Sequence, residues 1–136
     1  RLTGEPRYLE FCQMVLRRWD GPRGPRLITD LAAGRGVHQV GNAKAYEMMS
    51  CLNGALELYR VTGDAQILQA IRHAWSDIVA QRLYITGTCS QHEYFHTAHE
   101  LPNSLQNIDA TLPMPLRCRV MFTLNSRHRA TQSLRS

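Results

Sequence analysis

The chain has 136 residues, a length that suits one domain, and 43% of them are hydrophobic, as in an ordinary globular protein. Its formal net charge of +5 comes entirely from five arginines beyond position 109, because residues 1–109 carry equal numbers of basic and acidic side chains. We therefore expect no nucleic-acid partner for the folded part. No apolar run approaches the ~20 residues that span a bilayer, so no membrane partner is expected.

A sequence repeat marks the starts of two predicted helices. Residues 1–10, R-L-T-G-E-P-R-Y-L-E, return at 60–69 as R-V-T-G-D-A-Q-I-L-Q, a shift of 59 residues. In each copy a glycine suits the left-handed end of one helix, and an acidic residue follows at the start of the next. A unit of this length fits two helices and their connections, so the repeat predicts stacked helical hairpins.

Apolar residues at helical spacing predict three helices, over residues 6–19, 42–61 and 64–83. Asn42 is the predicted N-cap of the second helix, and Asp64 starts the third. The glycines and prolines of residues 21–25 end the first helix, and residues 27–40 are expected to be irregular or a short hairpin. We expect the helices to pack as antiparallel neighbours around five large side chains, those of Trp19, Leu56, Tyr59, Ile71 and Trp75.

The helical pattern fails near the end of the chain. Residues 110–136 contain two prolines, five arginines and no acidic side chain. Such a composition is typical of a segment that cannot bury enough apolar surface to fold. We therefore expect two parts, a helical domain over residues 1–108 and a poorly ordered basic tail over residues 109–136.

Side chains that can move a proton or bind a metal gather in residues 84–103, Y-I-T-G-T-C-S-Q-H-E-Y-F-H-T-A-H-E-L-P-N. His92, Glu93 and His96 match the pattern H-E-x-x-H. On a helix this spacing places both imidazoles on one face for zinc and leaves the glutamate to activate water. A zinc-dependent metallopeptidase therefore requires a helix over residues 91–97, with His99 or Glu100 as the nearest third ligand.

Two other interpretations of the same stretch stay open. It can be a polar loop in which the histidines are solvated, while Glu93, beside two aromatic residues, could serve as a general acid. The whole chain can also be a non-catalytic module of helical repeats that binds a partner through exposed helix faces. The cysteines form no C-x-x-C pair, which argues against a zinc ribbon: Cys12, Cys51, Cys89 and Cys118.

Several short motifs occur in a recognisable order: G-N-A-K-A-Y-E-M-M at 41–49, L-Y-R-V-T-G-D at 58–64, Y-I-T-G at 84–87, a glutamate, and L-P-N at 101–103. In this order and spacing the chain resembles glycoside hydrolase family 127, the β-L-arabinofuranosidase-type family. The resemblance covers residues 1 to about 108, a middle slice of the family's catalytic domain. It implies an all-α fold, a partial (α/α)6 barrel built of helical hairpins, for which the repeat is independently suitable.

The resemblance also implies a retaining glycosidase acting on glycosides such as β-L-arabinofuranosides. Glu93 stands where the family has its general acid/base. Asn42 stands where the family has a substrate-facing histidine, in a G-H-A segment, and His92 adjoins Glu93; these two are the expected substrate-binding residues. The expected partners are a carbohydrate and, through exposed apolar helix faces, a second copy of the chain.

The family's nucleophile is a zinc-bound cysteine thiolate, and this half of the site departs from the pattern. The family follows L-P-N with E-T-C, whose glutamate and cysteine bind zinc. Here Asp109 stands at the glutamate, no cysteine lies two residues later, and Cys118 is out of register. We therefore expect no metal or cofactor in this chain, zinc only in the intact family site, a nucleophile from outside residues 1–136, and no turnover by this chain alone.

Overall fold

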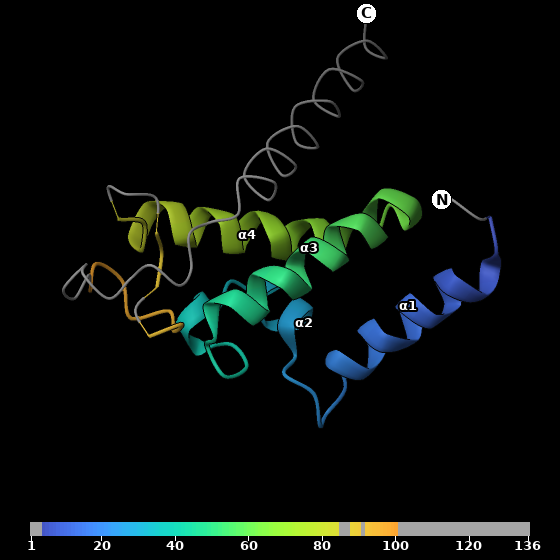
Figure 1. Ribbon diagram of the computed structural model, residues 1–136, viewed down its shortest axis with the longest axis horizontal. Helices are drawn as coiled ribbons and strands as arrows, with labels where there is room; N and C mark the ends of the chain where they lie inside the picture. The colour runs from blue at the N-terminus through green and yellow to red at the C-terminus, as the bar shows by residue number, and fades with distance from the viewer. Residues whose placement is uncertain (1–3, 85–87, 91, 101–136) are drawn as a thin grey trace, which may run out of the picture.

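The protein is described by a computed structural model that covers residues 4–84, 88–90 and 92–100 (Figure 1). In this part of the chain every regular element is helical: α1 (Pro6–Trp19), α2 (Leu27–Ala32), the 3-10 helix η1 (Val37–Gln39), α3 (Ala45–Thr62) and α4 (Ala65–Gln81). An isolated bridge pairs Lys44 with Tyr94. The expected all-α class is confirmed, while closure into a barrel and the boundary at residue 108 stay predictions.

Helices α3 and α4 form an antiparallel hairpin whose turn lies within the second copy of the repeat (Figure 1). Gly63 adopts φ 73°, in the left-handed region that favours glycine, and its amide donates to Tyr59 O at 2.8 Å. The Asp64 carboxylate then accepts from Gln66 N at 2.9 Å and caps α4. In the first copy Gly4 has φ 70° ahead of α1. The left-handed glycine predicted from the repeat is therefore present in both copies, whereas Glu5, the N-cap residue of α1, makes no side-chain cap bond.

Helix α2 occupies a segment where the sequence predicted irregular structure or a hairpin, and that prediction was wrong. Six residues are too few to show a helical period. The helix has no side-chain cap of its own. Instead the Asp20 carboxylate, which follows α1, accepts from Ile28 N at 2.9 Å and from Thr29 N at 3.2 Å. Leu27, Ile28 and Leu31 are buried on the side that packs against α4.

The predicted core is correct at three of its five positions. Leu56, Tyr59 and Ile71 are buried, whereas Trp19 and Trp75 are only half-buried. Helix α1 spans the predicted residues, but it packs on α3 and none of its residues is buried. Trp75 packs at the margin of the core rather than within it, and Trp19 is not among the described side chains that pack against that core.

The start of α3 also differs from the prediction. Asn42 does not cap the helix; Lys44 is the N-cap residue and makes no side-chain cap bond. The Asn42 Oδ1 atom accepts from Lys44 N at 3.1 Å, in a local turn three residues before the helix begins. The helix begins later because Ala43 and Ala45 form backbone hydrogen bonds with a distant segment of the chain.

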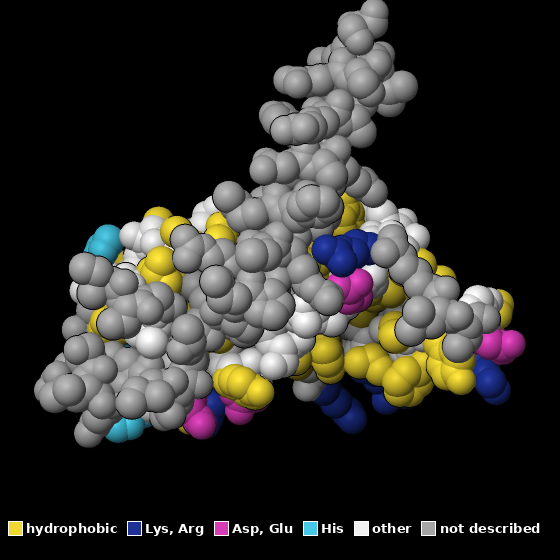
Figure 2. Space-filling view, turned by 45° about the horizontal axis from the view of Figure 1, so that its top comes forward, with side chains coloured by type: hydrophobic (Ala, Val, Ile, Leu, Met, Phe, Trp, Pro, Cys, Tyr) yellow, Lys and Arg dark blue, Asp and Glu magenta, His cyan; other side chains and the backbone are white. Residues whose placement is uncertain are grey.

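A hydrophobic surface remains open along α1. Tyr8 is 53% exposed and Phe11 60% exposed, and Figure 2 shows hydrophobic side chains gathered along α1 at the lower right. A groove of about 460 Å³ lies between α1 and α3, lined in part by Leu9, Leu58 and Val61. No helix in the described part of the chain is long and apolar enough to cross a membrane.

We expect the purified chain to self-associate through this face. Removing Phe11 from an apolar contact costs about 1.5–3 kcal/mol, which corresponds to about tenfold or more in a dissociation constant. Phe11→Glu should therefore weaken self-association by at least that factor in sedimentation equilibrium. Arg17→Gln, which also lowers the net charge by one on the same helix, should not. A monodisperse monomer at all concentrations would contradict the expectation.

Candidate active site

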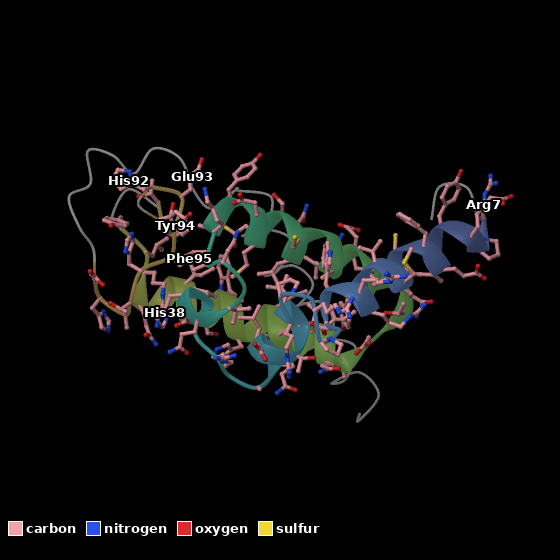
Figure 3. The ribbon with its side chains drawn as sticks, turned by 90° about the horizontal axis from the view of Figure 1, so that it is seen from below. Arg7, His38, His92, Glu93, Tyr94 and Phe95 are labelled. Carbon is pink, nitrogen blue, oxygen red and sulfur yellow. The ribbon has the colours of Figure 1, made fainter. Side chains whose placement is uncertain are left out.

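Two segments that are far apart in the sequence pair to build the candidate site. Lys44, just ahead of α3, forms an antiparallel bridge with Tyr94. Backbone hydrogen bonds lie on both sides of this bridge, from Ala45 N to Glu93 O at 2.7 Å and from Phe95 N to Ala43 O at 2.9 Å. The Phe95 side chain is 3% exposed and joins the core. The segments that carry Asn42, His92 and Glu93 are thereby brought together, beside the start of α3 (Figure 3).

Glu93 presents its carboxylate at the surface and is held by one cation. Its side chain is 50% exposed, and its Oε2 atom accepts from Lys44 Nζ at 2.5 Å. The same ammonium lies 4.8 Å from the centre of the Tyr94 ring, a cation–π contact. The hydrogen bond to Glu93 raises the pKa of Lys44 above its ordinary value, against an opposing effect of desolvation. The arrangement presents an accessible carboxylate with one oxygen fixed.

The backbone around this carboxylate is strained. Ala43 has φ 57°, His92 φ 49° and Glu93 φ 67°, in the left-handed region that residues other than glycine rarely adopt. Each such residue costs about 1–3 kcal/mol and persists only where the surroundings hold it, often at functional sites. Here the paired backbone segments supply those surroundings.

The helix that the metallopeptidase alternative requires is not formed over residues 92–97, which argues against that alternative. His92 and Glu93 form a turn, and Tyr94 pairs with Lys44. His92 is exposed, as in the polar-loop interpretation, while the His96 carbonyl accepts from Arg82 Nε at 2.9 Å. His99 and Glu100, the proposed third ligands, are also exposed; the His99 amide donates to Gln81 O at 2.9 Å, and the Glu100 carboxylate accepts from Thr97 Oγ1.

The described residues do not fit the zinc–thiolate half of the family site. Among residues 4–84, 88–90 and 92–100, no three histidine, cysteine, aspartate or glutamate side chains lie close enough to hold a metal ion. Cys89 is buried, and burial raises the pKa of its thiol to about 12. A thiol with that pKa does not provide a thiolate at neutral pH. Asp109 and Cys118 lie outside the described residues.

Asn42 is exposed and lines a cavity of about 680 Å³ near the start of α3. Asp30, Arg35 and Glu47 contribute charged side chains to the same cavity, whereas Glu93 is not among its lining residues. The Asn42 side chain accepts from the backbone of Lys44, and Glu93 accepts from the side chain of that residue. Lys44 therefore joins the two predicted site residues without bringing them into one cavity.

A buried polar network supports the loop that carries Glu93, and sequence reasoning missed it. Arg82 is 2% exposed; it donates to the Asp77 carboxylate, to His96 O at 2.9 Å, and its Nη2 lies 2.6 Å from His38 Nδ1. Asp77 Oδ2 accepts in turn from Val37 N at 2.8 Å. Burial and then Arg82 lower the pKa of His38, and Asp77 partly opposes this. Asp77 and Arg82 lie near the end of the predicted helix over residues 64–83, and no local sequence pattern there indicated these contacts.

The comparison with known families agrees with the resemblance. Residues 1–125 match the model of a family described as the beta-L-arabinofuranosidase, GH127 catalytic domain. No curated protein and no solved structure matches the chain. The family match covers most of the chain and includes every residue of the paired segments.

Proposed function

Because the chain belongs to the GH127 beta-L-arabinofuranosidase catalytic-domain family, we propose that it carries the general acid/base part of a retaining glycosidase site, with Glu93 as the proton donor. The family supports a glycoside hydrolase kind of function. The observation that carries the assignment of Glu93 is its accessible carboxylate, held by Lys44 against the segment that carries Asn42. The substrate class is a glycoside, of the β-L-arabinofuranoside type.

Glu93 has two tasks in this reaction. In the first step it gives its proton to the departing glycosidic oxygen while the bond between that oxygen and the anomeric carbon breaks. In the second step the resulting carboxylate takes a proton from the attacking water. Lys44 occupies Oε2, so Oε1 is the oxygen left to carry the proton when the carboxyl group is in its acid form. No described residue other than Lys44 bonds to this carboxylate.

Asn42 and His92 are proposed to bind sugar hydroxyl groups. Both side chains are exposed, and they come from the two segments that pair at the bridge. An amide and an imidazole each offer both donor and acceptor atoms, as sugar hydroxyls require. Cys89 is not proposed as the nucleophile, because it is buried and burial raises the pKa of its thiol.

The test supplies an external nucleophile. We expect the chain to release phenol from phenyl β-L-arabinofuranoside only when azide is added. Azide forms the new bond to the anomeric carbon, the bond to the phenolic oxygen breaks, and Glu93 gives that oxygen its proton, leaving a glycosyl azide. The measurement is phenol release with and without azide, with the sugar product identified by NMR.

Two outcomes would contradict this proposal. Phenol release without azide would place a working nucleophile within the chain. Absence of release at any azide concentration would remove Glu93 as an acid able to act on this substrate. A phenyl glycoside of a six-membered sugar serves as the matched control for substrate class, and we expect slower release from it.

A further inference from the structure

We propose that Lys44 is a positioning residue of this site, which fixes the Glu93 carboxylate and the loop around it through its side chain and its backbone together. The inference rests on the proposed function, because Glu93 is the acid/base there. It adds a residue that the predicted site did not include.

The side chain of Lys44 contacts two successive residues of the loop. Its Nζ atom lies 2.5 Å from Glu93 Oε2 and 4.8 Å from the centre of the Tyr94 ring. The Lys44 side chain is 23% exposed, so these contacts are partly shielded from solvent. Among the described residues, the other charged group near the ammonium is Glu47, on the first turn of α3. One ammonium thus holds a carboxylate and an aromatic ring at fixed positions.

The backbone of Lys44 is anchored from both directions. Its amide donates to Asn42 Oδ1 at 3.1 Å, and its carbonyl accepts from Met48 N at 3.0 Å in the first turn of α3. It also pairs with Tyr94 in the bridge between the two segments. A side chain mounted at the start of an 18-residue helix has a rigid base. The position of Glu93 is therefore set by α3 rather than by its own loop alone.

The residue type at this position is informative. Lys44 is the only lysine in the chain, and the other 15 basic residues are arginines. An arginine fork binds both oxygens of a carboxylate, whereas an ammonium is a point charge that can bond to one. Lysine therefore holds Oε2 and leaves Oε1 for the proton that moves. Arginine would serve equally well in a merely structural ion pair, whereas the positioning role requires lysine.

The first test needs no activity. Lysine-selective carbon-13 labelling gives a single ε-carbon signal, because Lys44 is the only lysine. The hydrogen bond to Glu93 raises the pKa of Lys44, so we expect Glu93→Gln to lower the midpoint of its NMR titration toward the ordinary value. An unchanged midpoint would overturn the proposal, whatever the chain does to glycosides.

The second test separates positioning from structure. In Lys44→Met we expect faster hydrogen exchange at the Ala45 and Phe95 amides, which donate across the bridge, and azide-dependent phenol release reduced by about 10- to 100-fold. Lys44→Arg should restore the slow exchange and leave the rate low. Arg60→Met, which removes a cation from an ion pair with Glu57 elsewhere on α3, is the matched control and should change neither.

The outcomes keep the two proposals distinguishable. Full activity in Lys44→Met or in Lys44→Arg would overturn the positioning role while leaving Glu93 as the acid/base. A lowered Lys44 midpoint in Glu93→Gln, together with no phenol release by the unaltered chain, would preserve the contact and reject the proposed function.

Discussion

Glu93→Gln is expected to slow azide-dependent release of phenol by about 10²–10⁴-fold, the usual contribution of a general acid. Glutamine keeps the shape of the side chain and has no acidic proton to give. A poor leaving group such as phenol needs that proton, because its oxygen otherwise departs as an unstable anion. 2,4-Dinitrophenol departs as a stable anion, so its release should fall far less in the same variant. The measurement is the pair of initial rates at saturating azide.

The difference between the two leaving groups is the informative result. A loss of the same size on both substrates would mean that the substitution disturbs the site rather than removing an acid. Glu100→Gln is the matched control, because Glu100 is exposed and lies in the same stretch. It should leave both rates unchanged. A larger loss in Glu100→Gln than in Glu93→Gln would reassign the proton donor.

The helices with strong local signals were predictable from the sequence. Helix α1 begins and ends where the apolar period does, and Asp64 caps α4 after the left-handed Gly63. These features depend on residues within one or two turns, so a single sequence contains what is needed. The extent of α3 was less predictable, because its start is set by a segment near residue 94.

Features that depend on contacts between distant residues were not predicted from the sequence. Helix α2 is capped by Asp20, a residue that directly follows α1 in the sequence. Trp19 was expected in the core on the basis of its type and spacing, but burial depends on how many neighbours α1 has. Hydrophobicity thus indicated which side chains can be buried and did not indicate which ones are.

The candidate site shows the same division. Family resemblance indicated Glu93 as the acid/base, while the H-E-x-x-H pattern allowed a zinc motif as an alternative that needs a helix. The pairing of Lys44 with Glu93 joins residues 49 apart, and that of Arg82 with His38 joins residues 44 apart. Neither pair has a spacing that a local pattern could reveal. One signal was present in the sequence, the single lysine among 16 basic residues.

Arg82→Met is expected to lower the free energy of unfolding by about 3–5 kcal/mol, the cost of breaking a buried ion pair from one side. Arg82 and Asp77 are 2% and 7% exposed, so the substitution leaves the Asp77 carboxylate buried without its cation. It also removes the donor to His96 O, which helps hold the loop that follows Glu93. The measurement is urea unfolding, beside Arg72→Met on the exposed face of α4, the helix that Arg82 follows.

A second substitution shows whether the cost comes from the stranded charge. In Arg82→Met with Asp77→Asn, the amide oxygen can still accept from Val37 N, and no buried carboxylate remains. We expect this double variant to regain much of the lost stability, since replacing both charges is far less costly than removing one. A double variant as unstable as the sum of its single variants would instead assign the loss to packing.

The pH dependence gives an independent check through His38. Its pKa is lowered in the folded protein, so the unfolded chain binds more protons as the pH falls below about 6.5. In the unaltered chain the contribution of His38 to the free energy of unfolding should therefore be fully present above that pH and decline below it. Burial is the largest cause of the lowered pKa of His38, and Arg82 is the second. The decline should consequently be shallower in Arg82→Met, and an unchanged slope would show that Arg82 and His38 do not interact in solution.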